Sequence, residues 1–508
     1  MKNSASRALN VRRGRPTLVV GAAVASALLL SACTSPSSGP DGQSADVVLP
    51  GTAPDGVTTI GDRLFPYVGN TGYDVGSYEV SYDYDPDDVV MTGAVAITAT
   101  ATADLDSLSL DSAMASVESV TVDGVEAPFD TGGEKLLIEP TRRINDGASF
   151  VVKARFTVDR STTPLSPLTD PADPVGIRPW VTWDDGFALM GQPDRAHVFF
   201  PMNDHPSDKA TVTVHVTAPD TLVVAANGTE TGRIPLDDSR ATTTFATRDP
   251  IATEVFQVAV GDFALMQRDA DGVSLLSWVP SGSEREMDRY VDLVPRHVRW
   301  MTDQVGAFPY ERYGVLVLPR DYQGVALETA TMSTYGTLSG SVQEIDDLML
   351  HETAHQWFGD AVSPASWDDM WLSEGHASFY GMLYQMEQGH ADLDDTFRRA
   401  YEYDVENRPV TGPPTQLRDR RDVLGSTNAP GVALLFALRE RVGASVFQEI
   451  ERTFVEEHLH GSATTADYVE VASRLSGEPL NAFFDEWLTS EHTPEMPGHP
   501  EWGAAGSR

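Results

Sequence analysis

Two histidines and a glutamate between residues 351 and 374 have the types and spacing of a metal site. His351 and His355 are four residues apart, so on an α-helix both imidazoles project from the same face. Glu374 follows after eighteen more residues and adds a carboxylate. Two nitrogens and one carboxylate, with a fourth position left open to water, are the ligands of a catalytic zinc ion. The sequence therefore predicts one Zn2+ per chain.

Glu352 lies next to the first histidine, where its carboxylate could take a proton from water held at the metal. A zinc ion lowers the pKa of such a water toward about 7 and polarises a carbonyl group, which are two requirements for cleaving an amide. The predicted role of Glu352 is therefore that of the catalytic base. This spacing alone would serve an endopeptidase as well as an exopeptidase.

The residues around these ligands resemble those of the gluzincin metallopeptidases of the aminopeptidase N type, a group that includes leukotriene hydrolase. The resemblance covers roughly residues 65–495. It implies an α+β multidomain fold, with an N-terminal antiparallel β domain followed by a thermolysin-like, mainly helical zinc metallopeptidase domain. The matching stretches are His351–Asp360, Trp371–Gly375, Phe200–Pro206 and Lys209–Thr211.

The resemblance also implies which residues hold the free N-terminus of a peptide. In the family, a glutamate on a strand just before the zinc helix binds the substrate α-ammonium, and Glu328 matches it within Val325–Thr329. In the family, a second residue that contacts the substrate amine lies in a short stretch that Gln192-Pro193-Asp194 matches. Asp194 is therefore a candidate for this second amine contact. The alternative for Glu328 is an ordinary surface glutamate at a strand end.

Val325, Leu327 and Thr329 around Glu328 depart from the family pattern, and so do three positions elsewhere. Asn428 stands where the family has a tyrosine that stabilises the transition state, and losing one oxyanion donor costs about 10²–10³ in rate. Asn428 is retained as a possible oxyanion donor, because an amide can donate a hydrogen bond. Gly381 replaces a second carboxylate, which could lower zinc affinity about 10–100-fold. His376 replaces a common phenylalanine, either as a pocket residue or as a polar filler.

The N-terminus has the pattern of an exported lipoprotein. A basic start is followed by the apolar stretch Leu18–Leu30, which is short for a membrane span, and then by Ser31-Ala32-Cys33. Cys33 is the only cysteine in the chain, so it has an evident use as a lipidated residue. We expect cleavage before Cys33 and a lipid anchor on the extracytoplasmic face of the cell membrane. The alternative is an inert thiol near a transmembrane anchor.

The chain is strongly acidic, with a net charge of −39. Removing residues 1–32 takes away five of the 36 basic residues and no acid, which leaves 31 against 75 acids, or −44. Such a field repels nucleic acid and anionic lipid, so neither is an expected partner. It could favour cationic substrates, although it could equally serve only to keep the protein soluble.

Hydrophobic periodicity divides the chain into two parts. Alternating residues such as Thr211–Thr217 predict β-strands up to about residue 265, and later spacing predicts helices, including Ser283–Gln304, Ile345–Asp360 and Glu374–Gln385. We expect a signal peptide at 1–32, a flexible linker at 33–60, the β domain at 61–266, the catalytic domain at 267–490 and a tail at 491–508. We expect no counterpart of the large C-terminal helical domain of longer relatives.

These features favour a zinc-dependent aminopeptidase that hydrolyses N-terminal residues from peptides outside the cell. A zinc endopeptidase is one alternative, in which Glu328 would have no amine to hold. A catalytically weak or inactive surface lipoprotein that retains the fold and binds a partner is another. Release of a free amino acid, cleavage of N-blocked peptides only, or zinc binding without turnover would separate the three.

Overall fold

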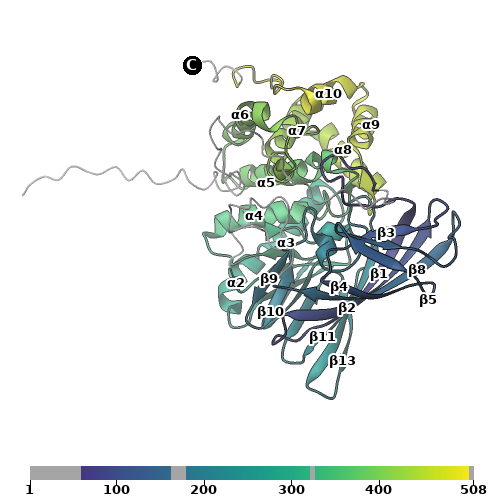
Figure 1. Ribbon diagram of the computed structural model, residues 1–508. Helices are drawn as coiled ribbons and strands as arrows, with labels where there is room; N and C mark the ends of the chain where they lie inside the picture. Colours follow the sequence, from purple (N-terminus) through teal and green to yellow (C-terminus); the bar gives the residue numbers. More distant parts are fainter. Residues whose placement is uncertain (1–58, 162–178, 321–325, 503–508) are drawn as a thin grey trace, which may run out of the picture. The chain divides into compact units, whose positions relative to one another are not determined.

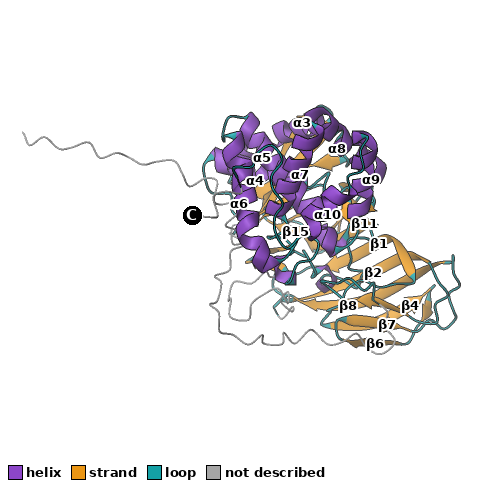
Figure 2. Cartoon of the chain, turned by 90° about the horizontal axis from the view of Figure 1, so that it is seen from above, coloured by secondary structure: helices purple, strands orange, loops and turns teal. Residues whose placement is uncertain are grey.

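A computed structural model describes residues 59–161, 179–320 and 326–502. Within them, a β-rich N-terminal part is followed by a mainly helical part, which confirms the expected fold class (Figure 1). Figure 2 shows the helices α3 to α10 gathered together, away from strands such as β2, β4 and β8. Cys33 and the predicted signal peptide lie outside the described residues.

The largest sheet has eight strands in the order β13-β14-β11-β1-β2-β8-β4-β5. Its strands alternate buried and exposed residues, as the period of two predicts. One pair departs from the expected antiparallel arrangement, because β1 and β11 run parallel. They are far apart in sequence, and only a long crossover can join parallel neighbours. The strands are β1 (Tyr73–Asp83), β2 (Val90–Ala101), β4 (Ser116–Val122), β5 (Val125–Glu126), β8 (Ser149–Asp159), β11 (Thr211–Pro219), β13 (Thr229–Pro235) and β14 (Arg240–Ala246).

Two smaller sheets complete the β-rich part, in the orders β12-β15-β10-β9 and β3-β7-β6. The loop after β10 carries residues 192–194, and the short helix η2 (Thr253–Val255) precedes β15. This sheet therefore brings both segments toward the helical part. The strands are β3 (Leu108–Asp111), β6 (Phe129–Gly132), β7 (Lys135–Ile138), β9 (Trp180–Trp183), β10 (Gly186–Leu189), β12 (Val223–Ala226) and β15 (Val258–Gly261).

The helical part contains its own sheet, β16-β17-β19-β21-β20, with β18 paired to β17. Strand β16 runs through residue 266, so the domain boundary expected there falls inside a strand of this sheet. Its strands are β16 (Phe263–Ala270), β17 (Val273–Pro280), β18 (Arg312–Tyr313), β19 (Val315–Val317), β20 (Ala326–Leu327) and β21 (Ser333–Tyr335). The short strands β22 (Ser363–Pro364) and β23 (Ser462–Ala463) pair separately.

The helices pack their apolar faces against this sheet and one another. The helix predicted at residues 283–304 is two helices, because Pro295 begins a new one near its own first turn. The helices are α2 (Glu284–Val291), α3 (Val294–Gln304), α4 (Val342–Ala354), α5 (His376–Glu387), α6 (Leu393–Thr411), α7 (Asn428–Val442), α8 (Ala444–His458), α9 (Thr465–Ser476) and α10 (Asn481–Thr489). Among the described residues, none of these helices is both long and apolar enough to cross a bilayer.

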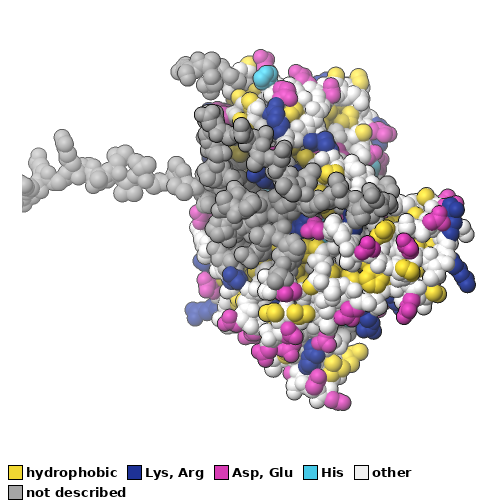
Figure 3. Space-filling view, in the orientation of Figure 1, with side chains coloured by type: hydrophobic (Ala, Val, Ile, Leu, Met, Phe, Trp, Pro, Cys, Tyr) yellow, Lys and Arg dark blue, Asp and Glu magenta, His cyan; other side chains and the backbone are white. Residues whose placement is uncertain are grey.

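Acidic side chains are spread over the face shown in Figure 3, with basic side chains between them. Outside the part covered by grey atoms, the negative charge of this face is therefore spread among basic side chains. A diffuse charge of one sign favours solubility more than the recognition of one partner.

Candidate metal centre

Helix α4 brings the two histidines together. It begins at a capping box, in which the Ser341 side chain accepts from the Glu344 backbone N–H and the Glu344 side chain accepts from Ser341. Residues such as Leu350 anchor its inner face in the core. The helix ends at Ala354, earlier than predicted, and His355 occupies the C-cap with helical φ. The two histidines therefore still lie one turn apart.

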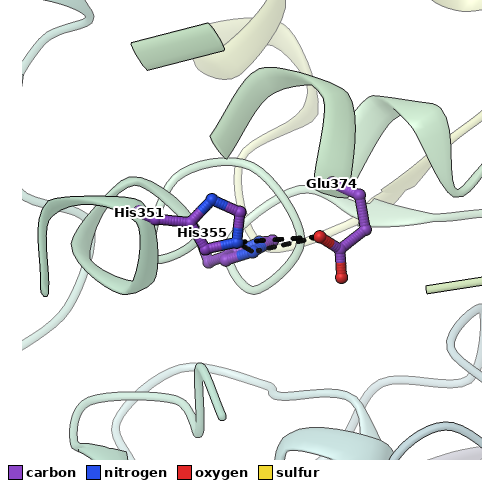
Figure 4. Close-up of side chains that lie close together, drawn as sticks. All are labelled: His351, His355 and Glu374. Atoms are coloured by element: carbon purple, nitrogen blue, oxygen red, sulfur yellow. Dashed lines mark hydrogen bonds and ion pairs between the residues drawn. The ribbon is translucent and has the colours of Figure 1, made fainter. Parts of the chain in front are cut away.

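The three predicted ligands converge (Figure 4). The Nε2 atoms of His351 and His355 are 3.1 Å apart, and Glu374 Oε2 lies 3.7 Å from His351 Nε2 and 3.8 Å from His355 Nε2. Ligand atoms held about 2.05 Å from one ion at tetrahedral angles are about 3.3 Å apart. The group is therefore close to the geometry of a tetrahedral zinc site, and its donor types fit zinc.

Glu374 is supplied by a π-helical turn. The sequence predicted it at the start of a regular helix, whereas it lies in η4 (Trp371–Gly375), which leads into α5. Gly375 packs directly against Gly431 of α7, where a Cβ on Gly431 would lie only 2.5 Å from the Gly375 Cα. This contact between two glycines seats the π turn on α7 and sets the position of Glu374. Such turns are frequent at functional sites.

The ring of His355 is held by its second nitrogen. Its Nδ1 lies 3.1 Å from the Phe358 carbonyl oxygen and 3.1 Å from Ser373 Oγ. A donated Nδ1–H leaves Nε2 unprotonated and aimed at the metal position. Gly359, at φ 120°, makes room for this arrangement, because a Cβ there would lie 2.4 Å from Ser373 Oγ.

Burial sets the charges of the centre. It lowers the pKa of His351 to about 3 and that of His355 to about 4, so both rings are neutral at pH 7 and free to bind a metal. Burial also raises the pKa of Glu374 and Glu352, and neighbouring carboxylates, Glu328 among them, add to both shifts. A bound dication would relieve this repulsion between buried carboxylates.

Glu352 and Glu328 face the same space. Ligand atoms of Glu328, Glu352 and His355 all lie within 4.8 Å of one another, and all three residues are buried. Glu328 follows β20 and is 4% exposed, so it is no surface glutamate. The structure thus places the predicted base and the predicted amine-binding residue beside the predicted ligands.

Gln356 joins the segment after β20 to the end of the zinc helix. Its Nε2 donates to the Glu328 carbonyl oxygen at 3.2 Å and to Asp360 Oδ2 at 2.7 Å. Its Oε1 accepts from the Thr331 backbone N–H at 2.8 Å. Both N–H donors and the carbonyl of this buried amide are therefore used. Gln356 thus ties the predicted amine-binding segment to the end of the helix that carries the metal ligands.

The neighbour of Glu328 in the loop after β10 is Gln192. Its Nε2 donates to Glu328 Oε1 at 2.6 Å. The carboxylate of Asp194, in contrast, accepts from the Tyr67 hydroxyl and lies 3.6 Å from Arg195 Nη2. The residue predicted as the second amine contact is thus engaged with Tyr67 and Arg195, and the structure brings Gln192 to Glu328.

Asn428 begins α7 and lies beside Glu374, to which its side chain forms a hydrogen bond that opposes the raised pKa of Glu374. Its Oδ1 is buried without a hydrogen-bond partner among the described residues. The structure therefore relates Asn428 first to a metal ligand, and its role as an oxyanion donor stays a prediction. Pro430 lies in the first turn of α7, where proline is tolerated.

The structure also shows the surroundings of His376 and Gly381, two further positions that depart from the family pattern. His376 is buried and stacks on Phe358 with ring centroids 4.3 Å apart, and its Nε2 lies 3.4 Å from Glu451 Oε2. It is therefore an interior residue. A Cβ on Gly381 would meet only the His351 Cβ, at 3.9 Å. No side chain from position 381 supports His351, whose Nδ1 lies 3.5 Å from Ser378 Oγ.

Sequence reasoning missed Ser373, Gln356, Gln192 and Glu254. The first two stand next to predicted ligands, in Trp371–Gly375 and His351–Asp360, so their place in the motifs was the available signal. Glu254 is an acid within the apolar run Ile251–Val260, which is itself unusual. Its connection to the centre depends on the fold alone.

Together, the fold and the site define a two-domain gluzincin metallopeptidase, with an HExxH helix and a downstream glutamate. The Peptidase family M1 domain matches residues 290–487, and the Peptidase M1 N-terminal domain matches residues 187–255. The chain belongs to peptidase family M1.

Known relatives cover different shares of the chain. Aminopeptidase 2 of Candida albicans is 23% identical over 75% of this chain and 43% of its own length. Aminopeptidase N of Acetobacter pasteurianus is 25% identical over 60% of this chain and 88% of its own length. The M1 zinc metallopeptidase of Deinococcus radiodurans has a similar crystal structure, with a TM-score of 0.73 and 26% identity over 87% of this chain and 99% of that one. The chain thus spans less than half the length of the Candida protein.

Proposed function

We propose that this protein is a zinc-dependent aminopeptidase that removes single residues from the free N-terminus of peptides. The observation that carries the proposal is the position of Glu328, which is buried beside Glu352 and His355. An endopeptidase has no use for a buried carboxylate at this place, whereas the α-ammonium of a peptide would neutralise it.

His351, His355 and Glu374 would hold the zinc ion. When bound, zinc lowers the pKa of a water molecule and polarises the scissile carbonyl. Glu352 accepts the proton of the attacking water and later delivers it to the leaving amine. Glu328 and Gln192 hold the α-ammonium, so that the first peptide bond lies at the centre.

Peptide substrates are supported by solved relatives. A variant of the Deinococcus radiodurans enzyme has been solved with a Tyr-Ser-Ala substrate, and two-domain M1 zinc metallopeptidases have been solved with L-tryptophan and with L-arginine. These ligands differ in side chain and share a free α-amine. We therefore propose recognition through the amine, without assigning a preferred side chain.

The test is a pair of variants assayed for zinc and for turnover of aminoacyl-coumarin reporters. Glu352→Gln should keep stoichiometric zinc and lose hydrolysis, because an amide cannot accept the proton, while His355→Ala should lose the metal. Glu449→Gln, an exposed residue on α8, is the matched control. Turnover by Glu352→Gln above roughly a few per cent of wild type would contradict the proposed base. Cleavage of only N-blocked peptides would favour an endopeptidase instead.

A weak or inactive binding protein is the second candidate, because Asn428 and Gly381 stand where the family has a tyrosine and a carboxylate. Bound zinc without turnover of any aminoacyl reporter would establish it.

We further propose that the protein is anchored to the extracytoplasmic face of the membrane through a lipid on Cys33. The support is the sequence Leu30-Ser31-Ala32-Cys33 after an apolar stretch. Cys33→Ser should shift the protein from the detergent phase to the aqueous phase. Unchanged partitioning would point to another anchor.

A further inference from the structure

Glu254 is a buried carboxylate behind the amine-binding residues. It lies in η2 of the β-rich part, is 3% exposed, and its Oε2 has no hydrogen-bond partner among the described residues. Burial and the nearby Glu328 carboxylate raise the pKa of Glu254. A buried polar atom without a partner is costly, so an acidic residue in this place needs a reason.

The backbone around Glu254 is fixed from two sides. Thr253 Oγ1 donates to Asp204 Oδ1 at 2.9 Å, and the Ala330 backbone N–H donates to the Val255 carbonyl oxygen at 3.1 Å. Ala330 lies two residues after Glu328. The glutamate is thus held in register with the amine-binding segment.

Gln192 stands between the two carboxylates. It donates through Nε2 to Glu328 Oε1 at 2.6 Å, and its side chain also forms a hydrogen bond with Glu254. The contact with Gln192 opposes the raised pKa of Glu254, as a donated N–H does, so both contacts come from the –NH2 end of the amide. The carbonyl oxygen of Gln192 is then the end that remains for another donor.

We propose that Glu254 is a positioning residue that orients the amide of Gln192, so that the Gln192 carbonyl oxygen and the Glu328 carboxylate together receive the substrate α-ammonium. Without Glu254, one N–H of Gln192 loses its partner, and the amide can turn its –NH2 end toward the ammonium. The –NH2 group of Gln192 and the substrate ammonium, both donors, would then face each other, and this weakens binding of the substrate amine. This inference rests on the proposed aminopeptidase function.

The test compares two zinc-binding probes that differ only in the amine, leucine hydroxamate and 4-methylpentanohydroxamate. Their affinities for the zinc-loaded full chain are measured by calorimetry, and the ratio reports what the α-ammonium contributes without any turnover. Glu254→Leu removes the acceptor for the second N–H of Gln192. Loss of one charge-assisted hydrogen bond costs about 1.5–3 kcal/mol, so this variant should reduce the wild-type ratio by about 10-fold or more. Glu254→Asp, whose carboxylate is drawn back by one methylene, should reduce it as well.

A purely structural defect would weaken both probes alike and leave their ratio unchanged. Gln192→Leu supplies a second comparison. Because Glu254 acts through Gln192, the double variant Gln192→Leu/Glu254→Leu should have the same ratio as Gln192→Leu alone. A wild-type ratio in both Glu254 variants would overturn the inference, as would a further drop in the double variant. If the wild type itself shows no preference for the amino compound, the proposed amine site fails, and this inference fails with it.

Discussion

At the scale of single residues, the candidate metal centre separates residues that a sequence motif can identify from residues that only the fold can identify. His351, Glu352, His355 and Glu374 were found because helical spacing and a local motif define them. Asp194 and Gln192 are only two positions apart, yet the fold sends the carboxylate of Asp194 to Tyr67 and the amide of Gln192 to Glu328. The path of the loop decides which of two such neighbouring side chains reaches the site, and spacing in the sequence does not predict that path.

The role of Asn428 can be determined by measuring zinc affinity and turnover separately in variants of this residue. Because it hydrogen-bonds Glu374, Asn428→Leu should weaken zinc binding by about 10–100-fold, as for other groups that orient a ligand. Competition with a chelator measures this affinity. Full zinc affinity with a lower kcat would show instead that Asn428 serves the oxyanion. In that case Asn428→Tyr, which restores the phenol of the family, should raise kcat.

At the scale of elements, periodicity predicted the division into a β-rich and a helical part and single elements such as β11 and α4, and it failed where tertiary contacts decide. The π turn that holds Glu374 depends on the packing of Gly375 against Gly431, which are far apart in sequence. The parallel pairing of β1 with β11 likewise depends on a long crossover. Helix α4 ends at Ala354, before its predicted limit, and Gly359 in the following turn has a φ of 120°, which lies outside the α-helical region.

The contact between η4 and α7 gives a prediction about Gly431. Gly431→Ala places a methyl group where only 2.5 Å is available, so η4 or α7 must move. We expect a loss of about 1–3 kcal/mol of stability together with weaker zinc binding, measured by urea unfolding and by metal analysis.

Gly381→Ala is the matched control, because its methyl group would make an ordinary contact at 3.9 Å within α5. This variant should still bind zinc, and its free energy of unfolding should rise by about 0.5–1 kcal/mol because alanine favours a helix more than glycine does. Equal behaviour of the two variants would show that the glycine contact does not position Glu374.

At the scale of the whole molecule, buried charges make stability depend on pH. Burial tends to lower the pKa of His197, but the hydrogen bond to Asp204 at 2.7 Å and the Glu134 carboxylate at 3.5 Å outweigh burial and raise the pKa to about 9. A raised histidine pKa stabilises the fold fully below the unfolded value of about 6.5, and this contribution is lost as pH rises through about 9. His197 therefore favours the folded state in neutral solution and less so in alkaline solution.

Urea unfolding at pH 6, 7.5 and 9 checks this expectation. His197→Gln should be less stable than wild type at pH 6, and the difference should shrink by pH 9. His215→Gln, at a partly exposed histidine of β11, is the control for replacing a histidine by glutamine. A difference that stays constant across this range would contradict the raised pKa.

Lys209 limits how this molecule can be divided. Its ammonium donates to the carbonyl oxygens of Asp360 at 2.7 Å, Ala361 at 2.9 Å and Gly461 at 3.1 Å, so all three of its N–H groups end in the helical part. Cutting the chain between its two parts would leave these carbonyls bare and remove Gln192 from Glu328. The metal-binding part therefore cannot be transferred alone. In domain shuffling or in a minimal engineered enzyme, both parts of the chain must be kept together.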